Sequence, residues 1–335
     1  MTRGFGRPAT GAVQDIGTEV AAALAEGRPV VALESTLITH GLPFPRNLEA
    51  ARRAEAAVRA GGAVPATVAI GGGVLRVGLE GAELEVLAQT EGAWKVTRQN
   101  LAAALGREGW SGTTVTATMI AARLAGIEVF ATGGIGGVHR GGERSLDVSA
   151  DLEELARTPL AVVCAGPKSI LDVPRTMEVL ETRGVPVVGW GTDELPGFFS
   201  VGSGIALSQR VDSGHQGADL IRRQRALGLG SAVLFCAPIP AGAALPRDEA
   251  DGAIEQAEAE ASAAGVHGPQ STPWVLSRVA ELTQGRSIAA NLALIENNAR
   301  LAAELAAALA AALAAVAGAR AGSPESDSGE QTAVP

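Results

Sequence analysis

Residues 160–183 read LAVVCAGPKSILDVPRTMEVLETR. They combine a short, continuous apolar run, a Gly-Pro turn and a longer stretch with helical patterning. A strand that is apolar on both faces and leads into a helix is typical of a βα unit, because a parallel sheet is covered by helices on both sides. We therefore predict a buried strand over 160–165 and a helix over 168–183.

The same alternation recurs along the chain. Five further apolar runs are predicted strands: PVVAL (29–33), PATVAI (65–70), IEVFAT (127–132), VPVVGW (185–190) and SAVLFC (231–236). Six further segments are predicted helices: 15–26, 46–60, 114–124, 214–226, 247–264 and 287–317. The pattern predicts an α/β fold, a three-layer α/β/α arrangement with a largely parallel central sheet.

One domain over residues 13–318 is the simplest organisation, since no composition break marks a linker. Residues 1–12 are expected to form a flexible N-terminus, and the polar segment 319–335 a disordered tail. The Gly-, Pro- and Ser-rich stretch 190–213 is expected to be a long loop, which in a compact domain is often functional.

Composition narrows the class of protein. The chain has 335 residues, is 47% hydrophobic and carries a net charge of −9, which argues against a general nucleic-acid binder. The N-terminus lacks the apolar core of a signal peptide, and the Ala- and Leu-rich segment 301–319 is expected to be a soluble surface or oligomer-interface helix. We therefore expect a cytoplasmic protein without membrane or nucleic-acid partners.

Cys164 and Cys236 end apolar runs and are predicted to be buried, reduced thiols on neighbouring strands.

Lysine is rare in this sequence. Of 27 lysines and arginines only two are lysine, Lys95 and Lys168. Lys168 follows a predicted strand, at the sheet edge where α/β proteins bind ligands, and opens the predicted helix. It is either a surface residue that escaped a bias towards arginine or a nucleophilic amine, a role that arginine cannot fill because it stays protonated and forms no Schiff base. Lys95 precedes VTRQN, a predicted helix start capped by Thr97, and is either a solvated charge or a contact for phosphate.

Other polar residues also follow predicted strands. Glu34 either caps a turn or serves as a proton donor, since its nearly uncharged surroundings predict a raised pKa. The glycines of ATGGIGGVHRGG do not have dinucleotide-binding spacing and are expected to let the backbone approach a ligand. His139 and Arg140 in this loop are either structural or ligand contacts.

Two further segments carry candidate residues. In SLDVSADLEEL, Ser149 or Asp151 could cap a helix, or Asp147 and its neighbours could bind a hard cation such as Mg²⁺ or Mn²⁺. In NLALIENNA, three asparagines lie within a predicted helix, where asparagine is unfavourable and usually has a reason. These are Asn291, Asn297 and Asn298.

Several segments together resemble the pseudouridine-5′-phosphate glycosidase family, also called indigoidine synthase A-like. They are VALESTLITHGLPFPRN, GAVPATVAI, KVTRQNL, GTTVTATM, VFATGGIGGVHRG, DVSADL, CAGPKSILD and NLALIENNA, and the resemblance spans roughly residues 15–315. It implies reversible cleavage of pseudouridine 5′-phosphate into uracil and ribose 5-phosphate. It also implies one Mn²⁺ per subunit and a homotrimer with an α/β/α core.

The resemblance also implies residue roles. Lys168 would be the Schiff-base nucleophile, Glu34 the proton donor and Asp147 the residue that holds the metal through waters. The implied substrate-binding residues are Lys95, Thr114, Val115, His139, Ser149, Ala150, Asp151 and Asn291. Two other readings remain open at this point, a Schiff-base aldolase or lyase acting on another phosphorylated sugar or C-glycoside, and a non-catalytic phospho-sugar sensor.

Overall fold

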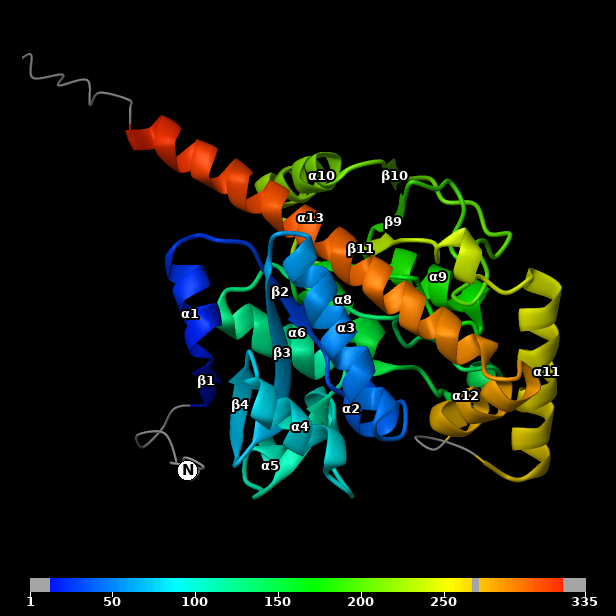
Figure 1. Ribbon diagram of the computed structural model, residues 1–335. Coiled ribbons are helices and arrows are strands. Elements are labelled where there is room, and N and C mark those ends of the chain that lie inside the picture. The colour runs from blue at the N-terminus through cyan, green and yellow to red at the C-terminus, as the bar shows by residue number, and fades with distance from the viewer. Residues whose placement is uncertain (1–12, 267–270, 322–335) are drawn as a thin grey trace, which may run out of the picture.

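The computed structural model describes residues 13–266 and 271–321, with residues 143 and 316–321 described in their backbone alone (Figure 1). The predicted flexible N-terminus lies outside the described residues, as does the predicted tail beyond Ala321. The start of that tail, residues 319–321, instead continues the last helix, which runs from Arg286 to Ala321.

The central sheet is mostly parallel. Its strands are β1 (Gln14–Ile16), β2 (Val30–Leu33), β3 (Val64–Gly71), β4 (Val74–Val77), β5 (Trp94–Val96), β6 (Trp110–Thr113), β7 (Val129–Ala131), β8 (Ala161–Cys164), β9 (Val187–Trp190), β10 (Arg210–Val211) and β11 (Val233–Cys236). Their order is β1-β4-β3-β2-β7-β8-β11-β9-β10, with β6 on β3 and β5 on β6. β3 pairs antiparallel with β4 and β6, and the other pairs are parallel. The predicted fold class and all six predicted strands are confirmed.

Five strands were not predicted. β5 and β6 are short and contain Lys95, Ser111 and Gly112, so they lack the apolar run that marks a buried strand. At the N-terminus the prediction was wrong, because Asp15 and Ile16 pair with β4 and the helix begins only at Thr18. A strand of three residues is too short to show a period of its own.

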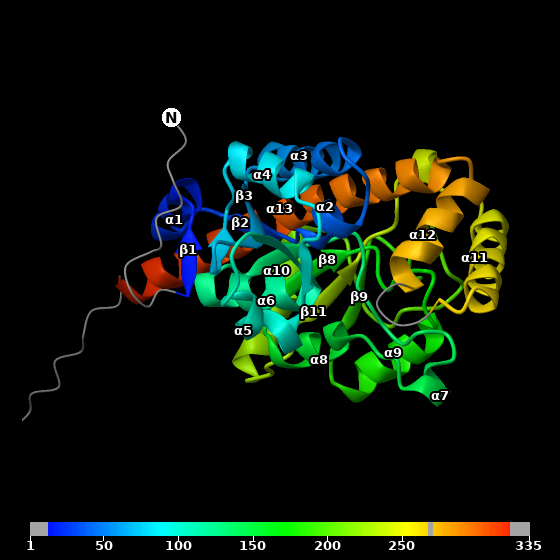
Figure 2. The same cartoon turned by 90° about the horizontal axis from the view of Figure 1, so that it is seen from below.

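Helices cover both faces of the sheet (Figures 1 and 2). They are α1 (Thr18–Ala25), α2 (Thr36–His40), α3 (Arg46–Ala60), α4 (Gly81–Gln89), α5 (Leu101–Ala104), α6 (Val115–Ala125), α7 (Gly142–Ser145), α8 (Ala150–Arg157), α9 (Val173–Thr182), α10 (Gly214–Ala226), α11 (Arg247–Ala263), α12 (Ser271–Leu282) and α13 (Arg286–Ala321), with short 3-10 helices η1 (Arg98–Asn100) and η2 (Ala241–Ala243). The predicted helices 46–60 and 214–226 are confirmed with the same bounds.

Alternate residues of each central strand point into two separate cores. In β2, Val31 and Leu33 pack with α3 and α13, whereas Val30 and Ala32 pack on the opposite face with α6. This alternation is the geometry of a strand covered on both sides. It explains why these strands are apolar without interruption.

The helix predicted to open at Lys168 begins five residues later. Asp172 is its N-cap and accepts a hydrogen bond from the Arg175 backbone N–H at 3.1 Å. Pro174 lies within the first turn, where its lack of an N–H has no consequence. Lys168 therefore lies in the loop between β8 and α9, and the prediction that it opens a helix was wrong.

Helix α13 belongs to the core as far as Leu309, which corrects the expectation of a surface or oligomer-interface helix for residues 301–309, whereas Ala311 and residues 313–315 are exposed. It packs against α3, α10, β2, β7 and β8. Among the described helices it is the one long and apolar enough to cross a membrane by length and composition, but half of its apolar window is buried inside the fold. Its many alanines let it lie close to the sheet.

The two cysteines confirm their prediction. Cys164 of β8 lies opposite Cys236 of β11, and both are buried and unbridged. The neighbouring Cys164 thiol, together with burial, raises the pKa of Cys236.

Candidate active site

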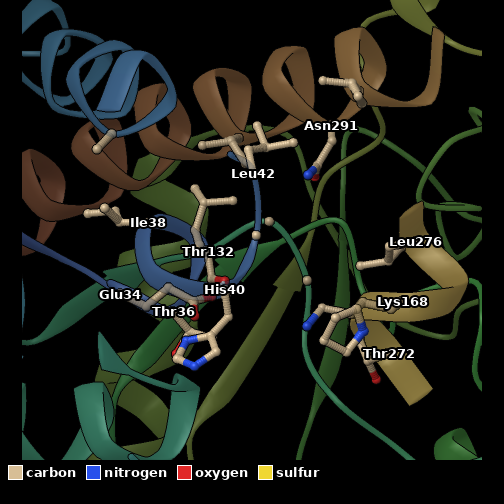
Figure 3. Close-up of a pocket in the computed structure, with 18 of the residues that line it drawn as sticks. Glu34, Thr36, Ile38, His40, Leu42, Thr132, Lys168, Thr272, Leu276 and Asn291 are labelled. Atoms are coloured by element: carbon tan, nitrogen blue, oxygen red, sulfur yellow. Dashed lines mark hydrogen bonds between the residues drawn. The ribbon is translucent and has the colours of Figure 1, made fainter. Parts of the chain in front are cut away.

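A cavity of about 220 Å³ lies at the carboxyl ends of β2, β7 and β8, beneath α12 and α13. Four of the predicted site residues line it: Glu34, Lys95, Lys168 and Asn291. Figure 3 shows Glu34, Lys168 and Asn291 reaching the cavity from different elements, with Asn291 pointing inward from α13. Parallel strands end at one edge of a sheet, so residues far apart in sequence meet there.

The backbone around Lys168 is held against the glycine-rich loop that follows β7. The Lys168 N–H donates to the Ile135 carbonyl at 3.1 Å, and the Lys168 carbonyl accepts from the Leu171 N–H at 3.0 Å. Pro167 forms a parallel bridge with Ile135. The loop that carries the Lys168 amine is therefore fixed by backbone hydrogen bonds. Lys168 does not lie at a helix N-terminus.

Glu34 follows β2 directly and is surrounded by protein, with its remaining exposure facing the cavity. The Thr132 hydroxyl donates to its carboxylate at 2.5 Å. Burial raises the pKa of Glu34, although the nearby Lys168 amine and the Thr132 hydroxyl oppose the shift. The predicted raised pKa is confirmed, and it suits a group that must carry a proton near neutral pH.

Lys95 reaches the same cavity from β5. Burial lowers the pKa of Lys95 and the charge of Lys168 lowers it further, whereas Glu34 and Asp151 raise it. Two amines and two carboxyl groups thus form one electrostatic cluster. The predicted cap is also confirmed, since Thr97 and Asn100 form a capping box at the start of η1.

Asp151 ties the glycine-rich loop to the start of α6. Its carboxylate accepts from the Gly136 N–H at 2.8 Å and lies near the Thr116 backbone, and burial raises the pKa of Asp151. Ser149 is the N-cap of α8 and accepts from the Asp151 N–H at 3.3 Å. The helix-cap interpretation of Ser149 is therefore confirmed.

Gly136 shows what the glycines of this loop permit. A Cβ atom at that position would lie 2.2 Å from the Ser149 Oγ and 2.9 Å from an Asp151 carboxylate oxygen. The close approach at Gly136 is thus to another segment of the chain, rather than to a ligand as expected.

Seven predicted site residues do not line this cavity: Thr114, Val115, His139, Asp147, Ser149, Ala150 and Asp151. The Thr114 hydroxyl is buried and donates to the Val96 carbonyl at 2.8 Å. The His139 N–H donates to the Asp147 carbonyl at 3.0 Å, which closes the loop that carries the Asp147 carboxylate. Within residues 13–266 and 271–321, no group of three or more His, Cys, Asp and Glu side chains forms a metal cage.

Several residues of the cavity were not predicted from the sequence. Phe198 and Phe199 of the predicted long loop line it, and His40 does so from the end of α2. Burial and the charge of Lys95 lower the pKa of His40, whose Nδ1 lies 2.7 Å from the Thr39 hydroxyl. His40 lies six residues after Glu34 in the sequence, and this short separation is the feature from which its place in the cavity could have been predicted.

Asn298 explains one of the asparagines of α13. Its amide is buried and donates to the carbonyls of Thr132 at 2.9 Å and Gly133 at 3.3 Å. Asn298 therefore fixes the backbone at the end of β7, including Thr132, whose hydroxyl donates to Glu34.

The family model described as indigoidine synthase A like protein matches residues 19–308. The chain belongs to this family. The resemblance found in the sequence is thereby confirmed.

Similar members of the indigoidine synthase A-like family include two named pseudouridine-5′-phosphate glycosidase. The protein from Paracoccus denitrificans is 57% identical over 85% of this chain and 94% of its own length. The protein from Sorangium cellulosum is 54% identical over 86% of this chain and 91% of its own length.

Two solved structures share the fold. The prealnumycin C-glycosynthase AlnA, in complex with ribulose 5-phosphate, superposes with a TM-score of 0.84 and 40% identity, covering 90% of this chain and 99% of that one. An indigoidine synthase A-like protein from Thermotoga maritima has a TM-score of 0.80 and 36% identity, covering 89% and 97%.

Proposed function

We propose that this chain is a pseudouridine-5′-phosphate glycosidase, which reversibly cleaves its substrate to uracil and ribose 5-phosphate. One observation carries the proposal: a single cavity holds the Lys168 amine, the Glu34 carboxyl with its raised pKa, and a second amine, Lys95. The names of relatives at 57% and 54% identity support it. So does the likeness to a C-glycosynthase solved with a sugar phosphate.

The bond to be broken explains why an amine is needed. Uracil is joined to ribose through carbon, so the leaving atom would be a carbanion. An ordinary glycosidase uses two carboxyl groups and expels an oxygen or nitrogen atom, which accepts the bonding electrons far more readily. A nitrogen lone pair on C1′ supplies the electrons that drive this cleavage.

The proposed reaction begins with ring opening. Glu34 gives its proton to the ring oxygen as the C1′–O bond breaks, and the Lys168 lone pair forms a bond to C1′. The Glu34 carboxylate then accepts the proton that the new ammonium group must lose. Next, the nitrogen lone pair forms a C=N bond, and the C1′–C5 bond breaks as C5 of uracil takes the proton that Glu34 now holds, leaving a protonated imine whose hydrolysis returns a proton to Glu34. Water adds to the resulting imine and releases ribose 5-phosphate and the free amine.

Lys95 is proposed to bind the phosphate and hold the opened, flexible sugar in line. Replacing Lys95 with methionine should lower kcat/KM about 10- to 100-fold, mostly through KM, because a charge-assisted hydrogen bond is lost. Lys95→Arg should retain part of the activity, since arginine also binds phosphate. Steady-state kinetics of the two variants check this, and equal loss in both would contradict a phosphate-binding role.

The remaining proposed contacts come from the family resemblance. Asn291 lies in the cavity and is proposed to contact the base or the opened sugar. The other proposed substrate-binding residues are Thr114, Val115, His139, Ser149, Ala150 and Asp151.

Asp147 is proposed to hold one Mn²⁺ per subunit through waters. Its carboxylate is the type of oxygen ligand that Mn²⁺ prefers, and an ion held by a single carboxylate keeps most of its water. When bound, the ion would neutralise phosphate charge.

Chelation with excess EDTA is therefore expected to abolish turnover, and added Mn²⁺ to restore it. Titration of the apoprotein with Mn²⁺, followed by electron paramagnetic resonance, should show weaker binding by Asp147→Asn than by the parent. Activity that persists in EDTA, together with unchanged Mn²⁺ binding by the variant, would remove Asp147 from the site.

The function itself is tested by comparing pseudouridine 5′-phosphate with uridine 5′-phosphate and following the change in uracil absorbance. Turnover of the first and not of the second is expected. Release of no uracil from either substrate would favour the aldolase or sensor readings. From the family resemblance we also propose that the protein is a homotrimer located in the cytoplasm. Light scattering on the purified protein tests the trimer.

A further inference from the structure

We propose that Phe198 is a positioning residue: held in a strained turn, its ring supports the loop that carries the Lys168 amine against the glycine-rich loop that follows β7. The proposal rests on the proposed role of Lys168 as the nucleophile. It gives a function to the segment between β9 and β10, which the proposed reaction does not use. Phe198 is 3% exposed and lines the cavity that holds Lys168.

The backbone of Phe198 adopts a conformation that a bulky residue rarely adopts. Its φ is +64°, in the left-handed region that favours glycine. The Phe199 N–H donates to the Gly197 carbonyl at 2.9 Å, which closes a γ-turn with Phe198 at its centre. A γ-turn with a positive φ at its centre is the rare and strained form, and strain of this kind persists only where surrounding contacts stabilise it.

The Lys168 loop (165–172) and the glycine-rich loop (132–138) run side by side, joined by backbone hydrogen bonds. The Ala165 N–H donates to the Gly133 carbonyl at 2.9 Å, and the Ile135 N–H donates to the Gly166 carbonyl at 3.1 Å. The Lys168 N–H then donates to the Ile135 carbonyl at 3.1 Å. The place of the Lys168 backbone therefore depends on how closely the two loops approach.

The Phe198 ring packs at a point where the two loops touch. A Cβ atom at Gly134 would lie 2.6 Å from Cε2 of Phe198 and 2.9 Å from the Gly166 carbonyl oxygen, so the ring and the carbonyl both lie against the Gly134 backbone. A Cβ atom at Gly166 would lie 3.3 Å from Cδ1 of Leu195. Phe198 thus packs on one loop and Leu195 on the other, beside the hydrogen bonds that join them.

The turn is anchored away from the paired loops, so it can act as a fixed support. The Leu245 N–H donates to the Phe199 carbonyl at 2.8 Å, which ties the turn to the segment before α11. The Leu195 N–H donates to the Ile205 carbonyl at 2.8 Å. The rings of Phe198 and Phe199 meet edge to face, with their centroids 4.8 Å apart and an interplanar angle of 78°. These contacts fix the orientation of the Phe198 ring.

Accurate placement matters for a nucleophilic amine. A displacement of about 1 Å at a reacting group can slow a reaction on the order of 100-fold. Without the ring, the two loops would lose the packing that supports their contact, and the Lys168 amine would be placed less accurately. Binding of the phosphate, which is proposed for Lys95, would be affected far less.

Comparison of alanine and glycine at position 198 tests the strain. Phe198→Gly should melt at the same temperature as Phe198→Ala or above it, because glycine adopts a positive φ without strain. Phe235 of β11 is the matched control, since it is buried and packs edge to face with Trp190 at 5.9 Å but does not line the cavity. There, Phe235→Gly should melt below Phe235→Ala. Glycine below alanine at both positions would overturn the proposal.

The rate of imine formation tests the effect on Lys168. With ribose 5-phosphate and cyanoborohydride, the adduct on Lys168 should form about 10-fold more slowly, or slower still, in both Phe198→Ala and Phe198→Gly. The concentration of ribose 5-phosphate that gives half the maximal rate should stay within about threefold of the parent's, because Lys95 is unchanged. Phe198→Leu should retain part of the rate, and Phe235→Ala all of it.

Phe198→Gly separates positioning from stability. A residue with a structural role alone would regain the rate together with the stability, whereas a positioning residue regains only the stability. A parental rate in Phe198→Gly would overturn the proposal.

Hydrogen exchange of the ligand-free protein tests the same contact without any reaction. Amides in peptides 132–138 and 163–170 should exchange about 10-fold faster, or faster still, in both Phe198 variants than in the parent, while those of β11 stay protected. Phe235→Ala should show the reverse pattern. Unchanged exchange of the two loops would overturn the proposal, even in an active enzyme. The expected exchange without any adduct on Lys168 in the parent would support the contact and count against the proposed function.

Discussion

Replacing Lys168 with arginine is expected to reduce turnover of pseudouridine 5′-phosphate on the order of 10⁴-fold or more, the range typical of a lost nucleophile. Arginine preserves the charge beside Glu34 but stays protonated, so it has no lone pair to form the bond to C1′. The loop that carries residue 168 would keep its position, because its hydrogen bonds to Ile135 and Leu171 are made by backbone atoms. Measurement of kcat, with the melting temperature as a check on folding, tests this expectation.

The covalent step can be observed directly. Borohydride added in the presence of ribose 5-phosphate should reduce the imine and leave a ribosyl adduct on Lys168, detected by mass spectrometry of peptides. Lys95→Arg is the matched control, because it removes the other lysine and should retain the adduct. An adduct on Lys95, or none on Lys168, would contradict the assignment of the nucleophile.

Glu34→Gln is expected to lower kcat about 10²- to 10⁴-fold, since the amide keeps the shape of the side chain but has no proton to give. In the parent, kcat/KM should fall as the pH rises through the raised pKa of Glu34, because the donor must be protonated. This alkaline limb should be absent from the residual activity of the variant. An identical pH profile in both proteins would assign the proton to another group.

The same carboxyl also predicts an effect on stability. Burial raises the pKa of folded Glu34 above its unfolded value, so the folded state binds its proton more tightly. The free energy of unfolding therefore loses this contribution as the pH rises from the unfolded pKa through the raised folded pKa. Glu34→Gln should be more stable than the parent above that range and closest to it at acid pH.

Melting temperatures measured over a pH series check this difference. Glu26→Gln serves as the control, because Glu26 is exposed and its substitution should change stability little at any pH. A Glu34→Gln difference that does not vary with pH would show that folding does not raise the pKa of Glu34.

Much of the fold could be predicted from local sequence. Each of the six predicted strands is an apolar run buried on both faces, and this pattern does not depend on the rest of the chain. β5 and β6 could not be predicted in this way, because their pairing with each other and with β3 is what makes them strands. The predicted start of α9 was wrong because residues 168–171 have helical patterning in the sequence. The helix instead begins after Asp172, its N-cap, with Pro174 in its first turn.

The sequence by itself determined the chemistry that was possible: two lysines among 27 basic residues, a glutamate at the end of a strand, and the segments that identify the family. Only the tertiary structure decided which groups act together. It placed Asn291 in the same cavity as Glu34, buried α13 in the core as far as Leu309 and used Asp151 to hold the glycine-rich loop. The physical reason is that hydrophobic periodicity is local, whereas a cavity is formed by contacts between residues far apart in the chain.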